Sequence, residues 1–142
     1  MSELAKAPLY SPQMLGLAVE LARYPFRPDA RFGGEARSTT CGSTLAISFD
    51  DEFVPIGLKV IACAVGQASA AIFARHCAGK SKSEIIAAHV AITEWLGGDA
   101  PLPDWPDLDL IAAARDYPAR HGAILLPWKA ALGALSSGEQ GR

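Results

Sequence analysis

The alternation of side chains between residues 44 and 49 constrains the fold more than any other feature of the sequence. In the segment TLAISF, large apolar residues alternate with smaller ones, and this period of two is typical of a strand with one buried face. An acidic stretch at 50–52 follows, and a second apolar run covers 56–63. The sequence therefore predicts an antiparallel β-hairpin within residues 43–63.

Helical patterns occupy the rest of the chain, on both sides of this hairpin. A Ser-Pro pair at 11–12 has the residue types of an N-cap and a first helical position, and a capping box at 81–84 opens a helix that Gly97 ends. Further helices are expected from about residue 66, at 108–116 and from about 121 to 135. Because strands and helices are segregated along the chain, we predict an α+β fold, with a small antiparallel sheet packed against several helices.

The composition is typical of a globular chain and argues against several classes of function. The 142 residues fit a single domain, 1–142, with a core at about 11–135 and a flexible tail at 136–142. A net charge of -2 without a basic cluster argues against nucleic-acid binding. No apolar run approaches the roughly 18 residues of a membrane span, and the N-terminus lacks the apolar region of a signal peptide. Three cysteines, an odd number, favour reduced thiols in a cytoplasmic protein.

Two of the three cysteines are placed symmetrically about the hairpin turn. Cys41 lies eleven residues before Glu52 and Cys63 eleven after it, so a register centred on Glu52 would set the two thiols opposite each other. A slip of one residue would turn one thiol to the other face of the sheet. The pair can bind a soft metal or carry sulfur, and it can equally be two small buried side chains. Cys77, well inside the following helix, is expected to serve packing alone.

The three histidines suggest different roles. His89 falls in the apolar stripe of its helix and is expected to be partly buried and hydrogen-bonded. His76 is expected at an exposed helix end, where a cation is favourable. His121 opens the last helix, from which its imidazole can face a neighbouring site, although a structural role is the commoner one. The sequence has no phosphate-binding glycine loop, no HExxH and no nucleophile elbow, so it does not indicate an enzyme.

Five short motifs, in order along residues 24–135, resemble the IscU/NifU-type (SufU-like) family of iron–sulfur cluster assembly scaffolds. The segment RYPFRPDARF is similar to the stretch after the family's first helix, and CGST and ACAVGQASAAI resemble its first two cysteine motifs. GKSKSEI is similar to the start of its next helix, and ARHGAIL resembles the third motif, in which a histidine or lysine precedes a cysteine. The resemblance implies a divergent member with an IscU/NifU N-terminal-like fold.

The resemblance also implies a set of ligands, and it is incomplete. Cys41 and Cys63 match two of the family's three cysteines, and His121 matches its histidine, which implies an iron–sulfur cluster or zinc as the bound species. Gly122 stands where the family has its third cysteine, and Ser43 stands where it has an aspartate. Neither glycine nor serine replaces these ligands near neutral pH. The family's chaperone-recognition stretch is also replaced, by RDYPAR.

Three functions agree with this pattern. The first is a scaffold-like protein of iron–sulfur cluster assembly that binds iron or zinc, or accepts sulfur, through its two cysteines. The second is a degenerate, metal-free interaction module of the assembly machinery, and the third is a protein that transfers persulfide sulfur. By resemblance, the implied partners are a cysteine desulfurase and recipient apo-proteins, and a homo-oligomer remains open.

Overall fold

The predicted hairpin is present and is extended by one more strand. In the computed structural model, which describes residues 9–39 and 42–140, the strands β1 (Phe32–Arg37), β2 (Thr44–Phe49) and β3 (Gly57–Ile61) form an antiparallel sheet in the order β1–β2–β3. The alternation at 44–49 appears as burial of the large apolar side chains of β2. The predicted α+β class is confirmed.

The register of the hairpin differs by one residue from a register centred on Glu52. Thr44 pairs with Ile61, so the centre of the hairpin lies between Glu52 and Phe53. Both of these turn residues have positive φ angles, 58° and 65°, and lie within the short 3-10 helix η3 (Asp51–Phe53). Beyond the end of β3, the same register would set Cys63 level with Gly42. Cys41 lies outside the described residues, so the predicted opposition of Cys41 and Cys63 stays a prediction.

The helices begin where the sequence predicts. The α-helices are α1 (Pro12–Glu20), α2 (Ala64–His76), α3 (Lys82–Leu96) and α4 (His121–Gln140). The Ser11 hydroxyl accepts a hydrogen bond from the Met14 N–H at 3.1 Å, and the capping box between Ser81 and Glu84 is complete. The stretch 108–116 is a 3-10 helix, η4 (Leu108–Asp116), and α4 continues five residues past the predicted end.

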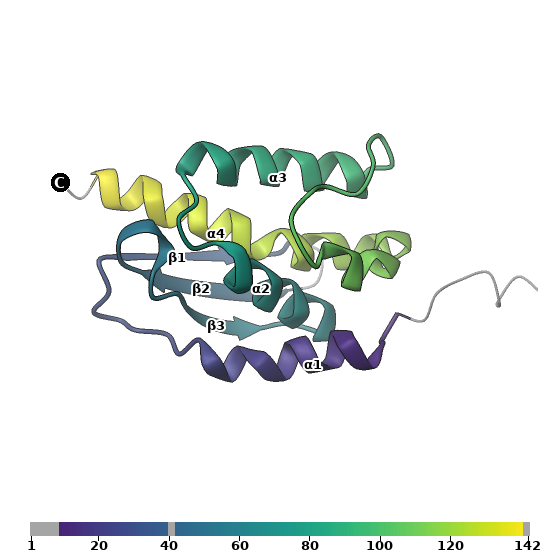
Figure 1. Cartoon of the computed structure of the whole chain (residues 1–142), viewed down its shortest axis with the longest axis horizontal. Coiled ribbons are helices and arrows are strands. Elements are labelled where there is room, and N and C mark those ends of the chain that lie inside the picture. Colours follow the sequence, from purple (N-terminus) through teal and green to yellow (C-terminus); the bar gives the residue numbers. More distant parts are fainter. Residues whose placement is uncertain (1–8, 40–41, 141–142) are drawn as a thin grey trace, which may run out of the picture.

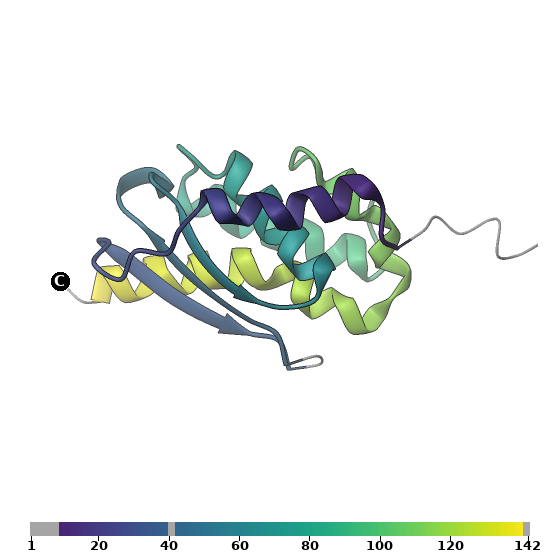
Figure 2. The same cartoon turned by 90° about the horizontal axis from the view of Figure 1, so that it is seen from below.

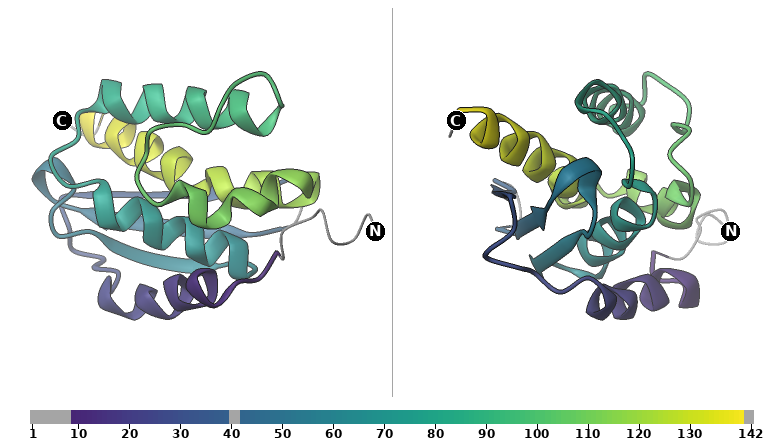
Figure 3. Two further views of the ribbon diagram at one scale, coloured as in Figure 1. Left: turned by 45° about the vertical axis from the view of Figure 1, so that its right-hand side comes forward. Right: turned by 60° about the vertical axis from the view of Figure 1, so that its left-hand side comes forward.

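The helices form layers on the sheet (Figures 1 and 2). Helix α4 packs across β1 and β2, and α2 lies beside it. At Gly34 the two backbones approach so closely that a Cβ would lie 2.8 Å from the Ala130 carbonyl oxygen. Helix α3 lies over α4 on the side away from the sheet (Figure 3), and α1 runs along α2 at the β3 edge. The helix starts that carry the candidate site therefore belong to the layer next to the sheet.

A cluster of aromatic rings fixes the loop between α3 and η4 to this core. The rings of Phe73, Trp105 and Trp128 pack at centroid distances of 5.2–5.5 Å. The Trp105 indole N–H also donates a hydrogen bond to the Ile72 carbonyl oxygen of α2. Among the described helices, none has the length and apolar character needed to cross a lipid bilayer.

Candidate functional site

One end of the sheet brings together the turn between β1 and β2 and the junction between β3 and α2. Thr44 at the start of β2 pairs with Ile61 at the end of β3. The N–H of Ser38 donates to the Ser43 carbonyl oxygen at 2.8 Å, which ties the end of β1 to the start of β2. The start of β2 and the end of β3 therefore lie at the same end of the sheet (Figure 2).

Cys63 occupies the N-cap of α2 at this end. The chain is extended at Cys63 (φ -67°, ψ 172°) and becomes helical at Ala64, where the β-branched run gives way to small residues. The thiol is free and partly exposed, and it makes no capping hydrogen bond. Cys63 therefore stands where α2 presents backbone N–H groups that have no partner within the helix.

The starts of α2 and α4 touch each other. A Cβ at Gly66 would lie 2.7 Å from the Ala62 Cβ and 3.2 Å from the Ala123 Cβ, so only glycine allows this approach without a shift. The buried Ser69 hydroxyl fastens the contact by donating to the Ile124 carbonyl oxygen at 2.7 Å. Cys63 and His121 each lie within one helical turn of this contact, on different helices.

His121 is the first residue of α4, and a backbone carbonyl of η4 holds its ring. Its Nε2 lies 2.7 Å from the Arg115 carbonyl oxygen. A carbonyl oxygen only accepts, so Nε2 is the donor, and in the neutral form of the ring this places the lone pair on Nδ1. Histidine ligands of metals commonly have this arrangement, with one ring nitrogen donating to a backbone carbonyl and the other binding the metal.

The other predicted site positions contribute less. Gly122 is the second residue of α4 and offers no side-chain donor. Ser43 is 5% exposed, so the residue in place of the family's aspartate lies inside the turn. Within residues 9–39 and 42–140, no group of three or more His, Cys, Asp or Glu side chains can hold a metal ion. The described donors at this end are therefore one thiol and one imidazole, which fit part of a thiolate and imidazole set.

The remaining cysteine and histidines lie away from this pair. Cys77 is buried, and burial raises the pKa of its thiol to about 12, in agreement with the predicted packing role. His76 is less exposed than predicted, because its Nε2 lies 2.8 Å from an Asp107 carboxylate oxygen. His89 is partly buried as predicted, but its Nε2 has no hydrogen-bond partner among the described residues.

Comparisons with known proteins were made for both the sequence and the structure. No protein-family model matches the chain, and no curated protein sequence matches it significantly. A NifU-like protein (N-terminal) from Brucella abortus, described as nitrogen-fixing, superposes with a TM-score of 0.82 at 28% identity, covering 94% of this chain and 96% of that one. This chain has the NifU N-terminal fold.

Two more solved structures share the NifU N-terminal fold. One is a putative iron–sulfur cluster assembly scaffold protein for the SUF system from the thermophile Fervidobacterium islandicum, with a TM-score of 0.77 and 22% identity over 89% of this chain and 96% of that one. The other is described as a hypothetical protein, with a TM-score of 0.70 and 20% identity over 87% and 97% of the two chains. The resemblance expected from the sequence motifs is confirmed at the level of structure.

Sequence reasoning missed the two residues that join the helix starts. Gly66 and Ser69 lie in an alanine-rich helix, and nothing local distinguishes them from packing residues. Their contacts with α4 join positions more than 50 residues apart, which no local pattern shows. A glycine and a serine spaced on one helix face, opposite the small residues of another, are the only signal that the sequence carries.

Proposed function

We propose that this protein acts in iron–sulfur cluster assembly as a scaffold-like protein that binds iron or zinc, or accepts sulfur, through Cys41 and Cys63. His121 would be an auxiliary ligand. The observation that carries the proposal is the contact between Gly66 and Ala123, which sets the α2 N-cap and the start of α4 beside each other on a NifU-like fold. Cys41 enters from the sequence motif alone.

The two cysteines and His121 suit a metal ion or cluster that the protein binds and then transfers to another protein. Two thiolates and an imidazole are soft donors of the kind that iron–sulfur clusters and zinc prefer. Gly122 leaves a fourth position open, and a partner or a second chain can supply that ligand. A cysteine desulfurase would supply the sulfur and apo-proteins would receive the product, in a cytoplasmic setting that keeps the thiols reduced. The role is binding and transfer rather than enzymatic turnover.

Anaerobic reconstitution with iron and sulfide tests this proposal. We expect the parent protein to take up stoichiometric metal, with a thiolate-to-iron charge-transfer band, and the Cys41→Ala/Cys63→Ala variant to take up none. Cys77→Ala is the matched control, since it removes a thiol that is buried within the core. Zinc is added in a parallel series. Equal metal uptake by the parent and the double variant would exclude the two cysteines as ligands.

A metal-free interaction module is the second candidate, supported by the burial of Ser43 and the absence of a side chain at Gly122. It predicts no stoichiometric metal in the parent and unchanged binding to the cysteine desulfurase when both cysteines are replaced. A pull-down with the double variant measures this. Labelling of the parent by the desulfurase in the absence of iron would instead identify persulfide transfer.

A further inference from the structure

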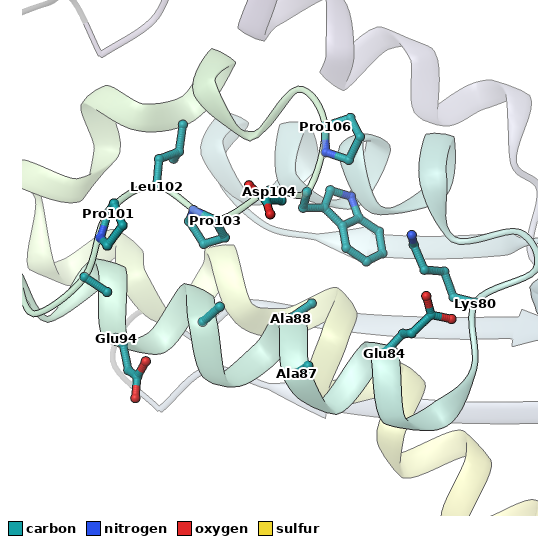
Figure 4. A pocket seen from close by; sticks show the side chains of 13 residues that line it. Lys80, Glu84, Ala87, Ala88, Glu94, Pro101, Leu102, Pro103, Asp104 and Pro106 are labelled. Carbon is teal, nitrogen blue, oxygen red and sulfur yellow. The ribbon is translucent and has the colours of Figure 1, made fainter.

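We propose that the groove between α3 and the proline-rich loop at 100–106 binds an extended, basic peptide segment of a partner protein. The groove has a volume of about 580 Å³, within the range of about 300–1,000 Å³ that is common for ligand sites. One wall is the exposed face of α3 and the other is the loop (Figure 4), and Trp105 of the loop also lines the groove. These elements differ from those that carry Cys63 and His121, so the proposal does not depend on metal binding.

The walls of the groove suit a polypeptide backbone. Small side chains, Ala87, Ala88 and Ala91, line the α3 wall and allow a chain to approach the helix closely. The loop wall contains three prolines, which lack backbone N–H groups, and Leu102 adds an exposed apolar side chain. The walls of the groove are therefore largely apolar, and its three prolines offer no backbone N–H groups to a bound chain.

The charged groups of the groove favour a cationic occupant that carries many hydrogen-bond donors. Glu84, Glu94 and Asp104 are exposed carboxylates, which only accept hydrogen bonds when ionised. Among the described lining side chains, only Lys80 and Trp105 carry N–H donors, and the Trp105 N–H already donates to the Ile72 carbonyl oxygen. Three carboxylates against one ammonium leave an excess of negative charge and of acceptors, which arginine or lysine side chains would complement.

The contact between Lys80 and Trp105 indicates where one such side chain would lie. The Lys80 ammonium is 5.3 Å from the centroid of the Trp105 ring, a cation–π distance. The Trp105 ring thus already attracts a cation from the chain itself. An incoming arginine would stack on the same face and compete with Lys80, because guanidinium groups favour such stacking.

The distance between Glu84 and Glu94 favours a peptide over a small cation as the occupant of the groove. Glu84 and Glu94 are ten residues apart on α3, which corresponds to about 15 Å along the helix axis. Figure 4 shows Glu94 toward one end of the α3 wall and Glu84 with Lys80 toward the other. An extended chain rises about 3.3 Å per residue, so two basic residues about four or five positions apart would reach both carboxylates at once.

Fluorescence anisotropy of a labelled peptide tests the proposal. The probe is a nine-residue peptide of glycine, alanine and proline with arginines at its third and seventh positions, and a matched peptide carries glutamates instead. At low salt we expect the arginine peptide to bind at least about tenfold more tightly than the glutamate peptide. Equal binding of the two peptides would overturn the proposal.

Variants of the protein locate the binding. Glu94→Gln/Asp104→Asn should weaken binding of the arginine peptide about two- to fivefold. Asp29→Asn/Glu35→Gln, which also neutralises two exposed carboxylates but on and just before β1, is the charge-matched control and should leave the binding unchanged. Glu84 is left in place because it completes the capping box of α3. Lys80→Ala should tighten binding about twofold, since it removes the competing cation. No effect of Glu94→Gln/Asp104→Asn would show that the peptide binds elsewhere and overturn the proposal.

Two further experimental results would indicate that the groove binds something other than a peptide. Spermidine that displaces the peptide at equal concentration would show that charge alone is recognised, without a chain. A dimer in sedimentation that Glu94→Gln/Asp104→Asn dissociates would assign the groove to a second copy of this protein. Either result would overturn the proposal. The proposal is supported if spermidine does not displace the peptide, no such dimer forms and the arginine peptide binds more tightly than the glutamate peptide.

Discussion

Gly122 offers no ligand to the metal that we propose binds near Cys63 and His121. It is the second residue of α4, where the family that the sequence resembles has a cysteine. A structural zinc ion commonly has four protein ligands and an iron–sulfur cluster commonly has four in total, so a glycine in place of one ligand leaves the set one short. In the proposed scaffold role, the residue at position 122 therefore sets how many protein ligands a metal would have.

Gly122→Cys should raise the affinity for zinc at least about tenfold, because a third thiolate would join the set at a helix start that stabilises negative charge. Competition with a chromophoric zinc chelator measures the change. Gly122→Ser is the control, since it makes the same backbone change with a poorly coordinating hydroxyl. Equal zinc affinities for the two variants would show that position 122 does not face the bound metal.

His89 is a second residue whose role can be tested, because it should affect how the free energy of unfolding depends on pH. It lies in the stripe of α3 that carries the buried Ile85 and Ile92, and its Nε2 has no hydrogen-bond partner among the described residues. Burial first, and the charge of Lys129 second, lower the pKa of its ring below the ordinary value of 6.5. The unfolded chain keeps the ordinary pKa, so below pH 6.5 the unfolded state binds the proton more readily.

The free energy of unfolding should therefore fall as the pH drops from 6.5 toward the lowered pKa of His89, with no contribution above 6.5. His89→Leu should remove this dependence and raise the free energy of unfolding by about 1 kcal/mol at neutral pH, since it also removes an unpaired polar group. Urea unfolding at about pH 7.5 and about pH 5.5 measures both effects. His89→Gln separates them, because it abolishes titration but keeps a polar side chain. A parent-like pH dependence in both variants would contradict the assignment to His89.

At the scale of the elements, the approach of α2 to α4 positions the candidate site. Gly66→Ala should lower the free energy of unfolding by about 1–3 kcal/mol, because its Cβ would clash with Ala62 and press on Ala123. It should also weaken metal uptake by moving the two helix starts apart. Gly133→Ala is the matched control in α4, where a Cβ meets open space and helix propensity should add about 1 kcal/mol. Urea unfolding of both variants checks the contrast, and a stabilising Gly66→Ala would refute the close contact.

The elements also show which parts of the fold a sequence can reveal. The caps of α1 and α3 depend on residues three positions apart, so the serines and their partners were predictable. Strand β1 could not be predicted locally, because its segment FGGEAR has no alternation and contains two glycines. Gly34 is explained by the close approach of α4, a contact about 100 residues away along the chain. The register was missed because two non-glycine turn residues adopt positive φ angles.

At the scale of the whole molecule, part of the candidate site could be predicted from the sequence, whereas the groove between α3 and the loop at 100–106 could not. The position of Cys63 at a strand-to-helix junction was visible in the sequence, since both elements have local patterns. The groove was not visible in the sequence, because tertiary contacts determine where the loop lies relative to α3. Trp105 fixes that loop through a hydrogen bond to Ile72, 33 residues earlier in the chain. Sequence reasoning could identify the loop at 100–106 as rich in proline, and no more.

A network of charged side chains joins elements that are distant in the sequence. The Arg75 guanidinium on α2 donates to both Glu20 carboxylate oxygens on α1 and to the Asp107 carboxylate before η4. The hydrogen bond from Arg75 lowers the pKa of Glu20, and hydrogen bonds from His76 first and Arg75 next lower the pKa of Asp107. Carboxyl groups with lowered pKa values stabilise the fold above their unfolded pKa values, and this contribution is lost as the pH falls through the folded ones.

Arg75→Met should therefore destabilise the protein most at neutral pH, by about 1–2 kcal/mol after allowance for the partial exposure of these groups. The difference from the parent should narrow as the pH falls below about 4.5, because protonated carboxyl groups no longer gain from the guanidinium. Urea unfolding at about pH 7 and about pH 3.5 measures the difference. Arg31→Met is the control, since it breaks a more exposed ion pair with Asp51 and should change stability by less than about 1 kcal/mol. A constant difference across this pH range would mean that Arg75 stabilises the fold through packing of its aliphatic stem rather than through its charge.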